Sequence, residues 1–147
     1  MHRSCREFAL KLFTSRDYSS YELRRKLASA GFSFTEINCA LEELDKLGLL
    51  DDERVLSEIL YKTIAKKPVG RERLLSLLDK LGVPLEKAQE IVKLFPDGQL
   101  ITLALNYLKK NKLATDRKKT LNFLRSGCFS EEEGRTILDE LGFLDSD

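Results

Sequence analysis

The feature that most constrains this chain is an apolar pattern of helical period that recurs three times. Aligning Gly31, Gly82 and Cys128 at one common position places the three copies 51 and 46 residues apart. Five further columns of this alignment then hold apolar side chains in fourteen of fifteen positions. Because each copy is too small to bury much surface alone, neighbouring copies are expected to stack on one another. The pattern therefore predicts an elongated array of tandem units.

Nearly every segment of the chain favours helix over strand. No stretch alternates apolar and polar residues over the length of a strand, and only eight glycines and three prolines interrupt the 147 residues. Ser19, Ser33 and Ser130 are each followed three residues later by a glutamate, which is the pattern of a capping box at a helix start. The predicted fold is all-α, with about nine short helices in three three-helix units. The expected helices cover residues 3–16, 19–30, 34–47, 52–66, 70–81, 84–94, 98–112, 116–127 and 130–141.

The three units are expected to form one elongated domain over residues 1–147. The internal repeats are expected to cover about 1–50, 51–97 and 98–147. Four glycines follow apolar-periodic segments and suit left-handed helix ends. These glycines are Gly31, Gly48, Gly82 and Gly142.

The composition excludes most catalytic and metal centres. The single histidine, His2, lies at the terminus, and the three cysteines are far apart with no CxxC pair. No glycine-rich phosphate loop occurs, and Asp51 and Asp52 are interpreted as helix-capping residues rather than as catalytic acids. We therefore expect no enzyme activity, no cofactor and no metal. Reduced thiols and the lack of an 18-residue apolar run favour a cytoplasmic protein without membrane contact, which we expect to be a monomer.

The charge of the chain is almost balanced overall but is segregated along it. The formal net charge is +1, yet residues 62–93 carry +4, residues 109–128 carry +6 and residues 31–61 carry −6. Basic clusters recurring at related repeat positions indicate a surface for an anionic partner, although solvated helix faces would show the same pattern. The candidate partner-binding or DNA-binding residues are Arg24, Arg25, Lys26, Lys66, Lys67, Arg71, Arg73, Arg117, Lys118 and Lys119.

A three-helix unit also invites comparison with helix-turn-helix DNA readers. The third helix of the first unit and that of the last unit are both strongly acidic, so phosphates would repel them from a major groove. Sequence-specific reading of DNA through these helices is therefore disfavoured. A non-specific DNA-binding module and a helical scaffold for another protein both stay open at this point.

Residues 16–32, with the sequence RDYSSYELRRKLASAGF, resemble the opening signature of the RecX family. Two later segments, LGLLDDERV and KPVGRERLLSLLDKLGV, are similar to further elements of that family. The chain departs from the family pattern at Val69, where an aromatic residue is common, and at Cys128, where a glycine is common. The residues that carry the resemblance are Arg16, Tyr18, Ser19, Glu22, Leu23, Lys26, Leu27, Gly31, Phe32, Leu50, Asp51, Asp52, Arg54, Gly70, Arg73, Leu74, Leu78, Gly82 and Val83.

This resemblance implies a regulator of the RecA recombinase. Members of the family bind the RecA–DNA nucleoprotein filament and restrain its ATPase, its strand exchange and its extension, and they are not enzymes themselves. The implied contact with DNA is weak or indirect, through the filament. Occupation of a filament groove and capping of a growing end are both compatible with the resemblance. The competing hypotheses are a DNA-binding module without RecA dependence and a scaffold unrelated to RecA.

Overall fold

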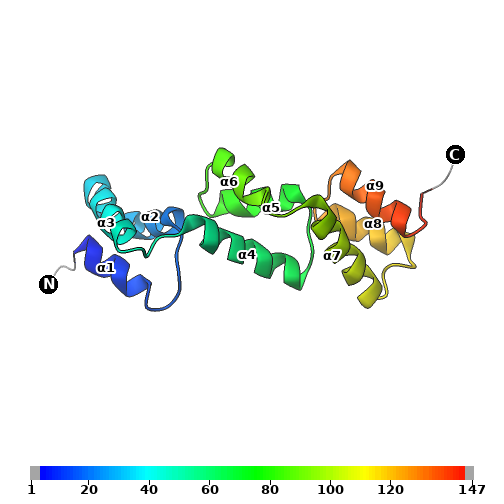
Figure 1. Ribbon diagram of the computed structural model, residues 1–147, viewed down its shortest axis with the longest axis horizontal. Helices are drawn as coiled ribbons and strands as arrows, with labels where there is room; N and C mark the ends of the chain where they lie inside the picture. Colours follow the sequence, from blue (N-terminus) through cyan, green and yellow to red (C-terminus); the bar gives the residue numbers. More distant parts are fainter. Residues whose placement is uncertain (1–3, 145–147) are drawn as a thin grey trace.

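The computed structural model describes residues 4–144, and these residues form nine α-helices without any strand. The helices lie in three groups of three along one long axis, with the first and the last helix at opposite ends of the array (Figure 1). The predicted all-α array of three-helix units is confirmed. The helices are α1 (Cys5–Leu12), α2 (Ser20–Ser29), α3 (Phe34–Lys46), α4 (Asp52–Lys66), α5 (Arg71–Lys80), α6 (Leu85–Val92), α7 (Asp97–Lys110), α8 (Arg117–Ser126) and α9 (Glu131–Glu140).

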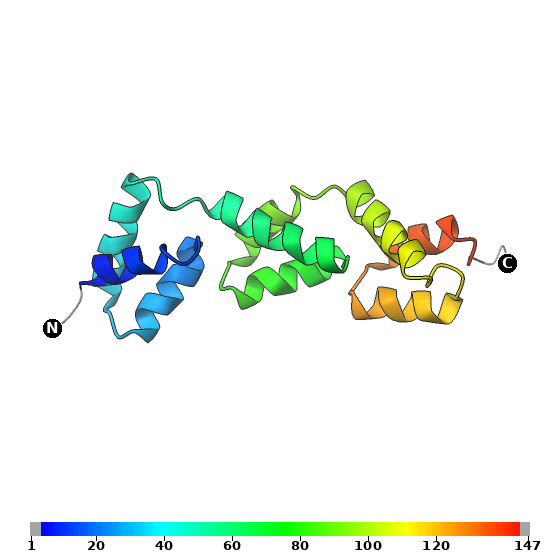
Figure 2. The same cartoon turned by 90° about the horizontal axis from the view of Figure 1, so that it is seen from below.

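The apolar interior is divided into three cores, one for each group of helices. Leu27, Leu78 and Leu124 occupy one column of the sequence repeat, and each lies in a different core. The middle core also receives Tyr21 from α2 and Leu100 from α7. These two side chains link the middle group to its neighbours by apolar contact, which removes apolar surface from water at both joints. The segments 47–51 and 93–96 connect successive groups along the same edge of the array (Figure 2).

The helix starts follow from short-range side-chain chemistry. The capping boxes predicted at Ser19, Ser33 and Ser130 are all present, with each serine accepting from the backbone N–H three residues later. Asp51 caps α4 in the same sense by accepting from the backbone N–H of Arg54 at 3.2 Å. These caps fix where α2, α3, α4 and α9 begin.

The residues that follow several helices share a left-handed backbone conformation. The four predicted glycine ends all have positive φ, between +74° and +95°. Cys128 shares the alignment column of Gly31 and Gly82, and its φ is +55°. A side chain therefore stands in the third unit at a backbone conformation that favours glycine.

Of the nine described helices only α4 has the predicted length, and the other eight are shorter than predicted, α1 by the most. The first helix is predicted to run to residue 16 but ends at Leu12, because the hydroxyls of Thr14 and Ser15 donate to the carbonyls of Lys11 and Leu12. Such bonds occupy the last carbonyls of a helix and favour a turn. The predicted first residue of this helix lies outside the described residues. The seventh helix ends at Lys110 rather than at residue 112, because Lys112 has a φ of +59°.

Candidate nucleic-acid and partner interface

The ten candidate basic residues lie on α2, α4, α5 and α8 and in the turn after α4, and they differ in their exposure. Arg24, Arg71 and Arg73 are half-buried, and the other seven are exposed. The half-buried arginines contact the protein itself, as does the exposed Arg25. These four therefore differ from the six remaining residues, which are Lys26, Lys66, Lys67, Arg117, Lys118 and Lys119.

Arg24 is held within the first group of helices. Its Nη1 donates to Oδ1 of Asn38 on α3 at 2.9 Å, and its guanidinium lies 5.8 Å from the ring centroid of Phe34. Phe34 is 73% exposed, so this ring faces solvent beside the guanidinium instead of packing in the core. The arginine joins α2 to the start of α3 and leaves part of its charge accessible.

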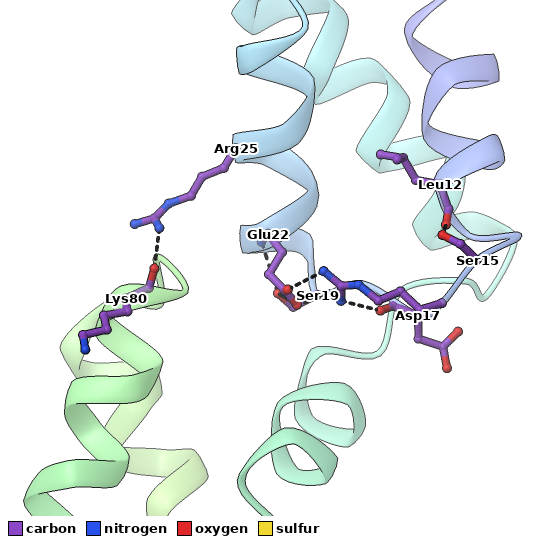
Figure 3. Close-up of polar contacts among 8 residues, drawn as sticks. Leu12, Ser15, Asp17, Ser19, Glu22, Arg25 and Lys80 are labelled. Atoms are coloured by element: carbon purple, nitrogen blue, oxygen red, sulfur yellow. Dashed lines mark hydrogen bonds and ion pairs between the residues drawn. The ribbon is translucent and has the colours of Figure 1, made fainter. Parts of the chain in front are cut away.

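Arg25 reaches across the joint between the first and the middle group, which we call the first joint. Its Nη1 donates to the backbone carbonyl of Lys80, the last residue of α5, at 2.5 Å (Figure 3). A helix ends with unpaired carbonyls and partial negative charge, so a guanidinium is well suited to this position. The guanidinium also passes over Gly82, where an added Cβ would lie 2.7 Å from Nε of Arg25.

A second set of polar contacts ties the first joint together at the start of α2 and α4. Asp52 accepts from both the backbone N–H and the hydroxyl of Ser20. Asp17 accepts from Nη1 of Arg54 at 3.3 Å, and this contact, with Glu58, raises the pKa of the Arg54 guanidinium. The sequence indicates only helix capping for Asp52. Its partner lies 32 residues away, and no short-range pattern indicates such a pair.

An open cleft lies at the first joint, and we call it the first-joint cleft. Its walls carry the cations of Arg16, Arg25, Lys26 and Lys80 and one carboxylate, Glu22. The remaining lining residues are Ser29 and Leu81.

Glu22 is already engaged inside this cleft. Arg16 donates to its Oε2 at 3.0 Å. Its Oε1 accepts from the backbone N–H of Ser19 and so completes the capping box (Figure 3). Partial burial opposes the charge of Arg16, but the bond and the charge of Glu22 raise the pKa of this guanidinium above its usual value. Tyr18 supports the same guanidinium through its ring, whose centroid lies 3.7 Å from Cζ. The cleft thus keeps three cations that no carboxylate in residues 4–144 neutralises.

The second joint, between the middle and the last group, is held by main-chain contact. The backbone N–H of Gly70 donates to the carbonyl of Gly127 at 2.9 Å. An added Cβ on Gly70 would lie 2.5 Å from Cα of Phe129, so the two backbones are in direct contact here. Arg73 crosses the joint as well, with Nη2 donating to the carbonyl of Ser126 at 2.6 Å.

Both joints therefore place an arginine of one group on the C-terminal end of a helix in the next. Lys80 and Ser126 close α5 and α8, and each lies two residues before the shared repeat position of Gly82 and Cys128. The donors do not share a column of the repeat, so the alignment alone does not predict this correspondence. The accepting groups are backbone carbonyls, which a sequence pattern does not reveal.

Arg71 makes contacts within the middle group and at the start of the last group. Its guanidinium donates to the carbonyls of Val92 and Phe95 and pairs with Asp97 at the start of α7. Three acceptors from the α6–α7 connection thus converge on one planar group, which is a geometry that lysine does not reproduce. The charge clusters of the sequence predict a partner-binding role for Arg71. In the structure, each edge of its guanidinium contacts an acceptor within the protein.

The exposed lysines have no comparable internal partner. Lys66 and Lys67 lie at the end of α4 and line an open cleft at the second joint, which we call the second-joint cleft. Lys118 and Lys119 lie in the first turn of α8, and Arg117 makes one long contact of 3.4 Å with the carbonyl of Phe143. Among the described residues, no carboxylate lies within 4.0 Å of these four lysine ammonium groups. The other residues of the second-joint cleft are Thr63, Val69, Arg73, Leu77, Ser126 and Gly127.

The part of the chain from residue 4 to 144 contains no cluster of three or more His, Cys, Asp or Glu side chains that would hold a metal ion. None of its helices is long and apolar enough to cross a membrane. Cys5 is buried, and burial, with a smaller contribution from Glu36, raises the pKa of its thiol. A thiol of this kind is a poor nucleophile at neutral pH.

Comparison with known proteins gives one consistent result. Residues 5–44 match the family model described as RecX, first three-helix domain. The chain is 33% identical over 139 residues to the regulatory protein RecX of Pelodictyon phaeoclathratiforme, covering 89% of this chain and 84% of that one. It is also 33% identical over 129 residues to the regulatory protein RecX of Prosthecochloris aestuarii, covering 86% and 85% of the two chains. The crystal structure of RecX from Lactobacillus salivarius superposes with a TM-score of 0.79 at 20% identity, over 95% of this chain and 96% of that one.

Proposed function

This chain belongs to the RecX family, and we propose that it binds the RecA–DNA nucleoprotein filament and restrains RecA. The restrained activities are the ATPase, strand exchange and extension of the filament. The observation that carries the proposal is the similarity to regulatory proteins named RecX over 89% of the chain. The structure supports it with an elongated array whose lysines are exposed along its length.

The mode of action that we propose is binding by many weak contacts along a filament. Each exposed charge pair contributes only about 0–1 kcal/mol, so affinity requires several of them at once. An array of three groups offers contacts at several positions along its axis, either in a filament groove or at a growing end. The protein acts in this proposal as a monomer in the cytoplasm, without catalytic activity of its own.

We divide the basic residues according to their internal contacts. Six of them have their charged groups directed to solvent or only weakly bonded, and these are proposed to face the filament. Arg25, Arg71 and Arg73 are proposed chiefly to hold the joints and the α6–α7 connection, and Arg24 to join α2 to α3. The six filament-facing residues are Lys26, Lys66, Lys67, Arg117, Lys118 and Lys119.

The test is the single-stranded-DNA-dependent ATPase of RecA, measured while the chain is titrated from far below to above the RecA concentration. Inhibition is the expected result. Inhibition far below one chain per RecA indicates capping of filament ends, and inhibition only near saturation indicates coating of a groove. A chain that is folded by circular dichroism and has no effect at any ratio would contradict the proposal.

A further inference from the structure

We propose that the first-joint cleft binds the phosphodiester backbone of a single DNA strand. The inference deepens the proposed function and rests on it, because the DNA of a filament would supply that strand. Arg16 and Lys80 thereby join the candidate binding residues, neither of which the charge clusters of the sequence indicate. Arg25 and Lys26 complete the basic walls of the cleft.

The charge balance of the cleft points to an anion. Four cations line it, and its one carboxylate, Glu22, is consumed by Arg16 and by the capping box of α2. Arg25 is bonded to a neutral carbonyl, so its positive charge stays uncompensated. Lys26 and Lys80 are exposed, and each comes from a different group of helices. The walls therefore present like charges to one another, and a bound anion would relieve their mutual repulsion.

The shape of the cleft points to a chain rather than to a small ion. The cleft is open to solvent, so it would not enclose and desolvate a free phosphate. Its cations stand on both walls, at α2 and at the end of α5, as a strand passing between them requires. Tyr18, whose ring lies against the Arg16 guanidinium, is 5% exposed and offers little surface for an apolar ligand.

The second-joint cleft favours a uniform polyanion over an acidic protein surface. It occupies the equivalent position between the middle and the last group, and it is lined by the cations of Lys66, Lys67 and Arg73 without any carboxylate. Basic clefts thus recur at both joints along the axis. A nucleic-acid backbone carries one negative charge at every nucleotide and can therefore occupy both clefts through the same chemistry.

Binding at this cleft would also act on the joint itself. A phosphate oxygen beside Arg25 competes with the carbonyl of Lys80 for the same guanidinium, and a charged acceptor forms the stronger bond. Occupation of the cleft therefore loosens one of the polar contacts that hold the first joint. The contacts of Ser20 with Asp52 and of Asp17 with Arg54 would remain.

The experiment is an NMR titration of the ¹⁵N-labelled chain with single-stranded oligothymidylate in low salt and without RecA. The comparison variant is the double substitution Lys26→Gln and Lys80→Gln, which removes two cleft cations but leaves the Lys80 carbonyl and the Arg16–Glu22 pair intact. The control is Lys46→Gln with Lys93→Gln, which makes the same change of net charge at exposed positions outside the cleft. Poly-glutamate at equal charge serves as the acidic-protein competitor.

We expect backbone and Arg25 side-chain resonances around residues 22–29 and 80–82 to shift with DNA and to return on addition of salt. The cleft variant should bind more weakly, with its logarithmic salt slope reduced by about 0.7 for each phosphate contact that is lost. The control variant should bind as the original chain does. Absence of shifts at the first joint, equal binding by the cleft variant, or displacement by poly-glutamate as effective as by DNA would overturn the inference. Because RecA is absent, this outcome is independent of the ATPase test of the proposed function.

Discussion

The guanidinium of Arg25 occupies the space that a side chain on Gly82 would fill. This residue donates to the last carbonyl of α5 while lying over the glycine that follows the helix, whose φ is +86°. Gly82 thus serves two purposes, because it adopts a left-handed conformation and it leaves room for a contact across the first joint.

Replacing Gly82 with alanine should therefore lower the free energy of unfolding more than the same change does at another glycine with positive φ. Gly31→Ala is the matched control, since Gly31 has a φ of +95° and nothing within 4 Å of an added Cβ. Each change should lower the free energy of unfolding by about 1–2 kcal/mol through the left-handed conformation. Gly82→Ala should lose a further amount of about 0.5–1.5 kcal/mol with the displaced hydrogen bond. Urea unfolding of both variants measures the difference, and equal losses would mean that Arg25 does not hold the joint.

The second joint should be sensitive to Gly70 for a different reason. Its φ is negative, so alanine adds no backbone strain, but the new Cβ would meet Phe129 Cα and the Cys128 carbonyl within 2.6 Å. The two groups of helices must then separate, at a cost of about 1–3 kcal/mol. Gly98→Ala is the control, because nothing lies within 4 Å of its added Cβ. Hydrogen exchange should show faster opening at residues 70 and 127–129 in Gly70→Ala, and unchanged exchange there would contradict the packing described.

We expect Arg71 to stabilise the fold chiefly through the geometry of its hydrogen bonds rather than through its charge. Arg71→Lys keeps the charge but loses the fork that reaches Val92, Phe95 and Asp97, so we expect a loss of about 1–3 kcal/mol in the free energy of unfolding. The double change Lys66→Gln and Lys67→Gln removes two charges and should leave stability within about 0.5 kcal/mol. For filament binding we expect the reverse, so that the double lysine change weakens binding more than Arg71→Lys does. A stable Arg71→Lys variant with impaired filament binding would show that Arg71 belongs to the binding interface.

Cys128 offers a stabilising substitution. It holds a φ of +55° at the repeat position where the other two units have glycine. Cys128→Gly should raise the free energy of unfolding by about 1 kcal/mol, because the left-handed conformation is unfavourable for a residue with a Cβ. Cys39→Gly, inside α3, should instead lower it by about 0.5–1 kcal/mol. Chemical denaturation of the pair tests both signs, and a loss of stability in Cys128→Gly would show that the thiol makes a stabilising contact.

Acid should weaken the start of α3 through Glu36. The backbone N–H of Ser33, and next its hydroxyl, lower the pKa of the Glu36 carboxyl below its reference value of 4.5. A lowered pKa in the folded state means that this contribution is complete above the unfolded-state pKa and is lost as pH falls through the folded-state pKa. Glu36→Ala should therefore flatten the fall of thermal stability with pH below about 4.5 compared with the original chain. Parallel curves for the two proteins would show that the carboxylate is not linked to folding.

Local chemistry makes much of the fold predictable. The three serine capping boxes and the glycine ends depend on spacing along one short segment, and the structure bears out each of them. Leu27, Leu78 and Leu124, which share a repeat column, each lie in the core of a different group. The end of α1 comes earlier than its apolar period predicts because the hydroxyls of Thr14 and Ser15 compete for the last carbonyls. The division of the repeats at residues 50 and 97 stays a prediction.

The joints are much less predictable than the helices. Arg25 and Arg73 bond to backbone carbonyls 55 and 53 residues away, and a carbonyl is present whatever the residue type. The position of Asp52 at a helix start already accounts for its charge, so nothing in the sequence points to its contact with Ser20. Net charge counted along the sequence treats all arginines and lysines alike. Their contacts in the structure distinguish the residues that hold the joints from the residues that face solvent. The assignment of the solvent-facing set to a partner remains a proposal.

The most direct measurement of the central proposal is co-sedimentation of the chain with preformed RecA filaments. The filaments are assembled on single-stranded DNA with a non-hydrolysable ATP analogue, and the controls contain the DNA alone or RecA alone. We predict that the chain pellets with the filament, and that Lys66→Glu, Lys67→Glu and Lys118→Glu together reduce pelleting far more than any one of them does. A folded chain that stays in the supernatant at every ratio of chain to filament would contradict the account.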